Sequence, residues 1–135
     1  MMTQKEIQLI KRSWRLFQQI KPEIVGDVFY SKLFDISPSL RRMFGTDMNA
    51  QYRKLMDMLS LIVARLDNLD VISTEISEMA ARHVKYGATP AHYKMVGNAL
   101  LWTLEHGLGN DWNEELKEAW SACYRKLSGA MIAGA

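Results

Sequence analysis

The chain has 135 residues, enough for one domain around one hydrophobic core. Its 48% hydrophobic and 24% charged residues are typical of a soluble globular protein and exclude intrinsic disorder and collagen-like repeats. The net charge of +2, with no basic stripe to concentrate it, does not predict nucleic-acid binding. No apolar run reaches the roughly 18 residues that span a bilayer, and no secretion signal is recognisable, so we expect no membrane partner and a cytoplasmic location. These observations predict a single domain over residues 1–135.

Two amphipathic helices are predicted in the first part of the chain. Thr3 and Glu6 have the spacing of a capping box, so a helix is expected over residues 3–19. Pro22 fits the first position of a second helix, which Ser37 and the proline after it end. The apolar faces of these two helices are predicted to consist of Ile7, Ile10, Trp14, Phe17, Val25, Phe29, Leu33 and Ile36.

A short helix and a long one are predicted next. Ser37 is the candidate cap of a short third helix that contains Leu40. The segment 45–50 is polar and rich in helix breakers, so it is expected to be a loop, with Asn49 capping the helix that follows. That helix is predicted over residues 51–66 from its apolar periodicity.

The following helix places a histidine among large apolar residues. After a polar turn, four residues recur at intervals of four, three and four, which puts them on one helix face. These residues are Ile72, Ile76, Met79 and His83. Gly87 is the expected end of this helix, because glycine accepts the left-handed backbone that closes many helices.

Two more helices complete the predicted fold. Thr89 and Pro90 mark the start of one of them, and Gly107 and Gly109 are expected to end it. The last helix is predicted to begin within 110–113. No segment shows the two-residue alternation of a half-buried strand, so the predicted fold class is all-α, with six or seven helices that cross rather than run parallel.

Of the three histidines, only His83 lies on an apolar face. His92 is expected to be solvated in the first turn of its helix, and His106 suits the negative end of a helix dipole. Zinc needs three or four convergent ligands, and a single cysteine, Cys123, excludes both a cysteine cluster and an intramolecular disulfide. Haem needs only one axial imidazole and a large apolar slot. A lone histidine on an apolar face is more often an ordinary core residue, so this pattern alone does not identify His83 as a ligand.

Four segments nevertheless resemble a known family. The segment RHVKYGATPAHYKMVG is similar to the proximal region of bacterial single-domain haemoglobins and of the globin domain of flavohaemoglobins. VFYSKLF, SPSLRRMF and AQYRKLMDML resemble the second helix, the third helix and the distal helix of the same family. The matching residues, in order, are Tyr30, Phe44, Gln51, Leu55, His83 and Tyr93. The resemblance covers essentially the whole chain and implies a globin fold whose fourth helix is short or absent.

The resemblance implies haem b, with His83 as the protein ligand of iron. The other ring nitrogen of His83 is then expected to donate to a backbone carbonyl one turn earlier, near Met79 or Ala80. The sixth coordination position would stay open for oxygen, NO or CO. Oxygen held there gains negative charge, so hydrogen-bond donors from Tyr30 and Gln51 imply high affinity and slow release.

The other implied haem contacts are mostly apolar. Lys54 is the expected partner of a haem propionate. The full set of these contacts is Phe44, Leu55, Lys54, Met79, Tyr93 and Val96. The residues themselves leave simpler alternatives open, since Tyr30 could be an aromatic core residue and Gln51 a solvated one at a helix start. The nine methionines are expected to fill the core rather than bind copper.

One position departs from the family pattern. In flavohaemoglobins a tyrosine and a glutamate polarise the proximal histidine. Tyr93 matches the tyrosine, but the position of the glutamate falls at about Ala135, with no acid nearby. The proximal network is therefore predicted to be incomplete, which argues against a peroxidase-like function.

Two functions share the implied pocket. The first is reversible oxygen binding for storage, delivery or scavenging. The alternative is nitric oxide dioxygenation, in which NO and oxygen give nitrate and a separate reductase returns the iron to the ferrous state. No flavin- or nicotinamide-binding domain is predicted in the 135 residues, so the electrons would come from another protein. A gas sensor is a third possibility, but no output module is recognisable in the sequence. A helical domain without haem is the remaining alternative.

Overall fold

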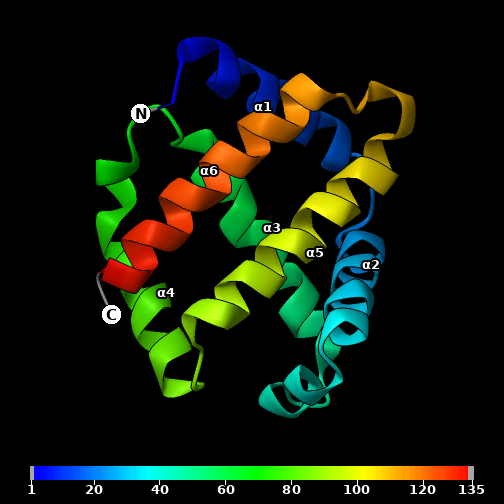
Figure 1. The fold of residues 1–135 in the computed structure, drawn as a ribbon, viewed down its shortest axis with the longest axis vertical. Helices are drawn as coiled ribbons and strands as arrows, with labels where there is room; N and C mark the ends of the chain where they lie inside the picture. Colours follow the sequence, from blue (N-terminus) through cyan, green and yellow to red (C-terminus); the bar gives the residue numbers. More distant parts are fainter. Residues whose placement is uncertain (1, 134–135) are drawn as a thin grey trace.

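The computed structural model describes residues 2–133, and within them the chain is entirely helical apart from its connections (Figure 1). Six α-helices and three short 3-10 helices occur in this part of the chain, and no strand does. The α-helices are α1 (Gln4–Phe17), α2 (Pro22–Ile36), α3 (Met48–Ala64), α4 (Ser73–Lys85), α5 (Pro90–Leu108) and α6 (Glu114–Ala133). The 3-10 helices are η1 (Pro38–Met43), η2 (Leu69–Ile72) and η3 (Gly109–Asp111). The all-α prediction is confirmed.

The helices cross one another instead of forming a parallel bundle. Helix α2 packs against both α3 and α5, while α6 packs against α1, α4 and α5. In Figure 1, α5 and α6 run diagonally across the front of the molecule, and α3 passes behind them. Helix α4 and the start of α5 meet at one corner, at the lower end of the view. The predicted crossed-helix packing is therefore observed.

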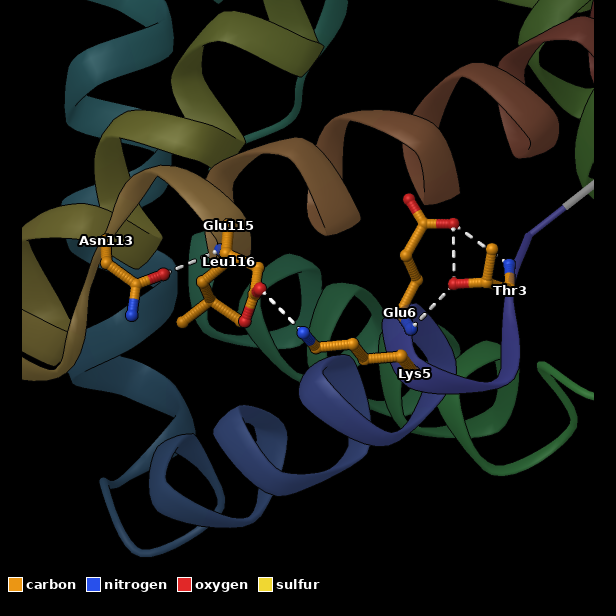
Figure 2. Close-up of polar contacts among 6 residues, drawn as sticks. All are labelled: Thr3, Lys5, Glu6, Asn113, Glu115 and Leu116. Carbon is orange, nitrogen blue, oxygen red and sulfur yellow. Dashed lines mark hydrogen bonds and ion pairs between the residues drawn. The ribbon is translucent and has the colours of Figure 1, made fainter.

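The N-terminal end of α1 has the predicted capping box. The backbone N–H of Glu6 donates to Thr3 Oγ1 at 3.1 Å, and the N–H of Thr3 donates to Glu6 Oε1 at 2.9 Å (Figure 2). Figure 2 also shows the ion pair of Lys5 with Glu115, which links α1 to α6 at 2.9 Å. Both side chains of that pair are exposed, so it contributes little to stability.

Two predicted caps differ from those observed. Ser37 occupies the cap position of η1, but its hydroxyl meets Ser39 Oγ and caps no backbone N–H. Helix α3 begins at Met48 rather than at residue 51, because the carboxylate of Asp47 accepts the N–H of Ala50 at 3.2 Å. The prediction of Asn49 as the cap was therefore wrong. The connection 44–47 between η1 and α3 contains no helix, as the resemblance implied for the fourth globin helix.

The prediction that Gly107 helps to end α5 was wrong. Gly107 does not end the helix but lies inside it, where an added Cβ would lie 2.4 Å from Phe17 Cζ. Gly109 ends the helix with a φ of +54°, in the left-handed region that favours glycine. Helix α6 then begins at Glu114, with the N–H of Leu116 donating to the side chain of Asn113 at 2.8 Å (Figure 2).

The core consists of two clusters. The larger one joins α1, α2, α3, α5 and α6 and includes Trp14, Phe17, Phe29, Leu104 and Trp120. The smaller one joins α3, α4 and α6 and includes Ile62, Ile76, Met79, Leu127 and Met131. The predicted apolar faces of α1 and α2 are buried in the larger cluster except for Ile36, which is 37% exposed. Ile72, Ile76 and Met79 are buried in the smaller cluster, while His83 on the same predicted face is half-buried. Within residues 2–133, no helix is both long and apolar enough to cross a bilayer.

Gly26 allows α2 and α3 to approach closely, and its replacement tests this contact. An added Cβ on Gly26 would lie 2.4 Å from Tyr52 Cβ, so the two helix backbones would have to separate. We expect Gly26→Ala to lower the free energy of unfolding by roughly 1–3 kcal/mol, measured by urea denaturation. Gly129→Ala, on the exposed side of α6 with nothing within 4 Å, is the control and is expected to be neutral or slightly stabilising. Equal stability of the two variants would contradict the close contact.

Candidate functional site

A cavity of about 860 Å³ lies among α2, α3, α4, α5 and α6, and residues from both core clusters line it. Its volume is within the range of about 300–1,000 Å³ typical of small-molecule and cofactor sites. All nine residues that the sequence predicted for the site line this one cavity. They are Tyr30, Phe44, Gln51, Lys54, Leu55, Met79, His83, Tyr93 and Val96.

Helix α4 contributes Met79 and His83 to the proximal wall. Because they are one helical turn apart, His83 Nδ1 lies 2.7 Å from the backbone carbonyl oxygen of Met79. A carbonyl oxygen only accepts hydrogen bonds, so Nδ1 carries the hydrogen and Nε2 is left with a free lone pair. Within residues 2–133, Nε2 has no hydrogen-bond partner. This is the contact that the sequence predicted for the second nitrogen of His83.

Two tyrosine rings flank the imidazole of His83. The ring of Tyr93, on α5, lies 6.2 Å from it at an interplanar angle of 30°, and the ring of Tyr86 lies 6.0 Å away at 62°. The hydroxyl of Tyr124 donates to the backbone carbonyl of Tyr93, which ties α6 to this part of α5. Burial raises the pKa of both Tyr93 and Tyr124, so both phenols are neutral. Ala135, at the position of the missing glutamate, lies outside the described residues.

The opposite wall holds a buried polar pair. Tyr30 comes from α2 and is only 5% exposed, and Gln51 comes from the first turns of α3. Gln51 Nε2 donates to the hydroxyl oxygen of Tyr30 at 2.9 Å, which leaves the tyrosine's own hydrogen free to donate into the cavity. Burial raises the pKa of Tyr30 to about 12, although the bond from Gln51 opposes this shift. The phenol therefore remains a donor at all physiological pH values.

The simpler alternatives for these two residues can now be compared with the geometry. Tyr30 does pack as an aromatic core residue, with ring centroids 4.9 Å from Phe29 and 5.3 Å from Phe44. Its hydroxyl end nevertheless borders the cavity with a polar partner. Gln51 is half-buried and hydrogen-bonded, so the alternative that it is merely solvated does not hold.

Two cations, one imidazole and one acid lie at the mouth of the cavity. Lys54 and Asp57 come from α3, Arg82 from α4 and His92 from the first turn of α5, and three of the four are exposed. Sequence analysis predicted Lys54 but missed Arg82 and His92. His92 is half-buried rather than fully solvated, because its Nδ1 accepts the N–H of Thr89 at 3.1 Å in a second capping box. The sequence could have indicated this capping box, because His92 follows the cap residue Thr89 by three positions.

The cavity face of α6 was also missed. Its apolar periodicity was recognised in the sequence, but only the fold shows that Cys123, Tyr124 and Leu127 border the cavity. Burial raises the pKa of Cys123 to about 12, so this thiol is protonated and unsuited to bind a metal as thiolate.

These groups limit what the cavity can hold. Within the described residues, no three His, Cys, Asp or Glu side chains converge as a metal site. The cavity offers the free imidazole nitrogen of His83, a neutral phenol–amide pair, apolar walls and cations at the mouth. A large, flat, apolar group that carries its own metal and acidic substituents fits this set, and haem is such a group.

The family model "Globin" matches residues 27–131 of the chain. The chain belongs to the globin family. Flavohemoprotein of Vibrio cholerae is 28% identical over 98% of this globin, which spans only 34% of that protein. An anaerobic nitrite reductase of Brassica napus is 30% identical over 97% of the chain and 90% of its own length. The predicted resemblance to this family is therefore confirmed.

A solved structure agrees with this globin fold. A bacterial globin from Campylobacter jejuni superposes with a TM-score of 0.86 at 24% sequence identity, covering 98% of this chain and 95% of that one. At this identity the comparison confirms the fold, including the crossed helices around the cavity.

Proposed function

We propose that this globin binds haem b in the cavity, with His83 Nε2 as the axial ligand of the iron, and that it binds oxygen reversibly. The observation that supports this most directly is the free lone pair of Nε2 in an otherwise apolar wall. Haem supplies four nitrogen ligands and a ferrous iron with one position open to a diatomic gas. A single domain over residues 1–135 and a cytoplasmic location are part of the same proposal.

The proximal residues orient the axial nitrogen. The Met79 carbonyl fixes both the tautomer and the ring orientation of His83, so Nε2 is held without rearrangement. Tyr93 and Val96 on α5 pack beside this site and exclude water. Because a neutral carbonyl rather than a carboxylate accepts from Nδ1, the imidazole donates less electron density than a carboxylate-paired one. This favours gas binding over cleavage of an O–O bond.

The distal residues stabilise negative charge that develops on oxygen. Because Gln51 donates to the hydroxyl oxygen of Tyr30, the hydroxyl hydrogen of Tyr30 is available to donate to a bound ligand. In a water-poor site such a donor is strong, because few solvent dipoles compete with it. We therefore infer high oxygen affinity with slow release, and the same pocket accommodates NO and CO. Phe44 and Leu55 complete the apolar wall.

The mouth of the cavity fits the propionates of haem. Lys54 on α3, Arg82 on α4 and His92 on α5 all line the cavity. Their positive or hydrogen-bonding side chains would pair with the two carboxylates of the cofactor at the surface. Lys54 is thus kept as a proposed propionate partner, and Arg82 and His92 join it.

Replacement of His83 tests the ligand assignment. We expect His83→Ala to lose stable haem, because no other nitrogen lines the proximal wall in a comparable position. The haem-to-protein ratio after purification measures this loss. His106→Ala, which removes an exposed imidazole away from the cavity, is the control and is expected to keep full haem content.

A second measurement separates ligand loss from misfolding. Free imidazole added to His83→Ala is expected to restore haem binding by filling the space of the lost ring. Normal haem content in His83→Ala without added imidazole would contradict the assignment.

Replacement of Tyr30 tests the distal donor. We expect Tyr30→Phe to speed oxygen dissociation roughly tenfold or more, since a hydrogen bond to a charged group contributes about 1.5–3 kcal/mol. Stopped-flow displacement of oxygen by CO measures the rate. Tyr52→Phe removes the hydroxyl of a neighbouring ring that does not border the cavity, and its rate should remain that of the parent. An unchanged rate in Tyr30→Phe would exclude its role as a donor.

Nitric oxide dioxygenation is a second candidate, supported by the similarity to a flavohemoprotein and by the same Tyr30–Gln51 pair. This activity needs one electron per turnover from a reductase. With a cellular reductase and NADH present, a dioxygenase consumes NO over many turnovers, measured with an NO electrode. A single stoichiometric burst is expected if the protein is an oxygen carrier, and sustained turnover would favour the enzyme.

A further inference from the structure

The small net charge of the chain hides a local asymmetry. Between Glu78 and Glu105 the sequence contains no aspartate or glutamate, but it contains Arg82, Lys85 and Lys94. This acid-free stretch includes the second half of α4 and most of α5, so it borders the proximal side of the cavity. The charged side chains of this stretch are therefore all positive.

These cations have no acidic partner. The four ion pairs found within residues 2–133 involve other residues, and none includes Arg82, Lys85 or Lys94. Lys85 is exposed at the last position of α4 and does not line the cavity. Its charge is therefore free to attract an external acidic surface.

Apolar surface lies beside the cations. Val84 is 52% exposed and Tyr86 is 56% exposed, although large apolar side chains are usually covered. Tyr86 also lines the cavity, with its ring 6.0 Å from the ring of His83. The side chain of Tyr86 is thus exposed at the surface and also close to His83, the proposed iron ligand. We call Val84, Lys85 and Tyr86 the proximal corner.

We propose that the proximal corner docks an electron-donating protein whose redox group is surrounded by acidic residues. This inference depends on the haem site proposed above. The reduced flavin or iron–sulfur group of the donor loses one electron, and the ferric iron gains it and becomes ferrous. No covalent bond forms or breaks in this step. The exposed aromatic ring shortens the path between the two groups, and the cations select the partner.

Charge argues for an acidic donor over a second copy of the chain. A symmetric dimer through this corner would bring two copies of Lys85 and of the acid-free stretch together, which is unfavourable without counter-charges. Interfaces that transfer electrons are small and depend on complementary charge, so a patch with one exposed aromatic ring and a few cations is sufficient.

The test measures reduction of the haem-loaded ferric protein by a reduced plant-type 2Fe–2S ferredoxin, an acidic donor, under CO. Lys85→Glu and Val84→Asp place negative charge on the proximal corner without altering a cavity residue. We expect both to lower the bimolecular rate roughly tenfold or more at low ionic strength, with the difference vanishing in high salt. Lys85→Arg keeps the charge and is expected to keep the rate.

Three controls make the outcome specific. Lys117→Glu reverses an exposed charge near the start of α6, at the opposite end of α5 from the corner, and should not slow the reaction. Photoreduced riboflavin, which is small and uncharged, should reduce all variants equally. Haem content is measured on the same preparations, so a failure to bind haem would reject the proposed function before docking is tested.

Two results would overturn the docking proposal while the haem site stands. One is an equal slowing of the reduction by Lys117→Glu and Lys85→Glu, because the rate would then depend on the net charge of the protein and not on the proximal corner. The other is a haem-loaded dimer in sedimentation that Lys85→Glu dissociates, which would assign the corner to a second copy of the chain.

Discussion

The hydrogen bond between His83 Nδ1 and the carbonyl oxygen of Met79 occupies one imidazole nitrogen and leaves the other with a free lone pair. The other imidazole that lines the cavity, that of His92, uses its Nδ1 lone pair to accept the N–H of Thr89. Tyr30 and Tyr93 are neutral phenols whose pKa values burial raises, and Cys123 is a protonated thiol for the same reason. Of the two imidazoles that line the cavity, His83 is thus the one left with a free lone pair, on Nε2, which suits a cofactor that needs a single protein ligand.

The two walls of the cavity depend on different packing contacts. The distal pair requires α2 and α3 to lie close enough for Gln51 to reach Tyr30. Gly26 permits this approach because it has no side chain to collide with Tyr52 on α3. The proximal wall depends on the smaller core cluster, in which α4 packs against α6 through residues such as Met79. Helix α3 contributes to both clusters, through Val63 to the larger and Ile62 to the smaller, so the two walls are not independent of each other.

The sequence predicted the helices well where the signal was local. The capping box of Thr3 and the apolar stripe leading to His83 were recognised because each depends on residues within a few turns. Predictions failed where the deciding partner was distant or where two residues competed locally. Gly107 was predicted to end a helix, but it lies inside α5, where its missing side chain leaves room for Phe17. Asp47 and Asn49 are both residue types that cap helices, and the side chain of Asp47 is the one that accepts the N–H of Ala50.

The site shows the same division. Residue types and order were sufficient to select the nine cavity residues through the family resemblance, and the Nδ1 contact of His83 followed from helix geometry. The bond from Gln51 to Tyr30 and the convergence of Arg82 and His92 at the mouth were not predicted, because they join different helices. Contacts of this kind are set by how helices cross, which periodicity does not specify.

The proposed roles place gas and electrons on different sides of the molecule. The donors that would hold oxygen come from α2 and α3, whereas the exposed ring of Tyr86 and the uncompensated cations belong to α4 and its connection to α5. A protein docked at the proximal corner would therefore leave the distal wall uncovered. Such a separation would leave the distal wall free to receive oxygen as soon as the ferric iron of a bound haem is reduced, which suits both an oxygen carrier kept in the ferrous state and a dioxygenase.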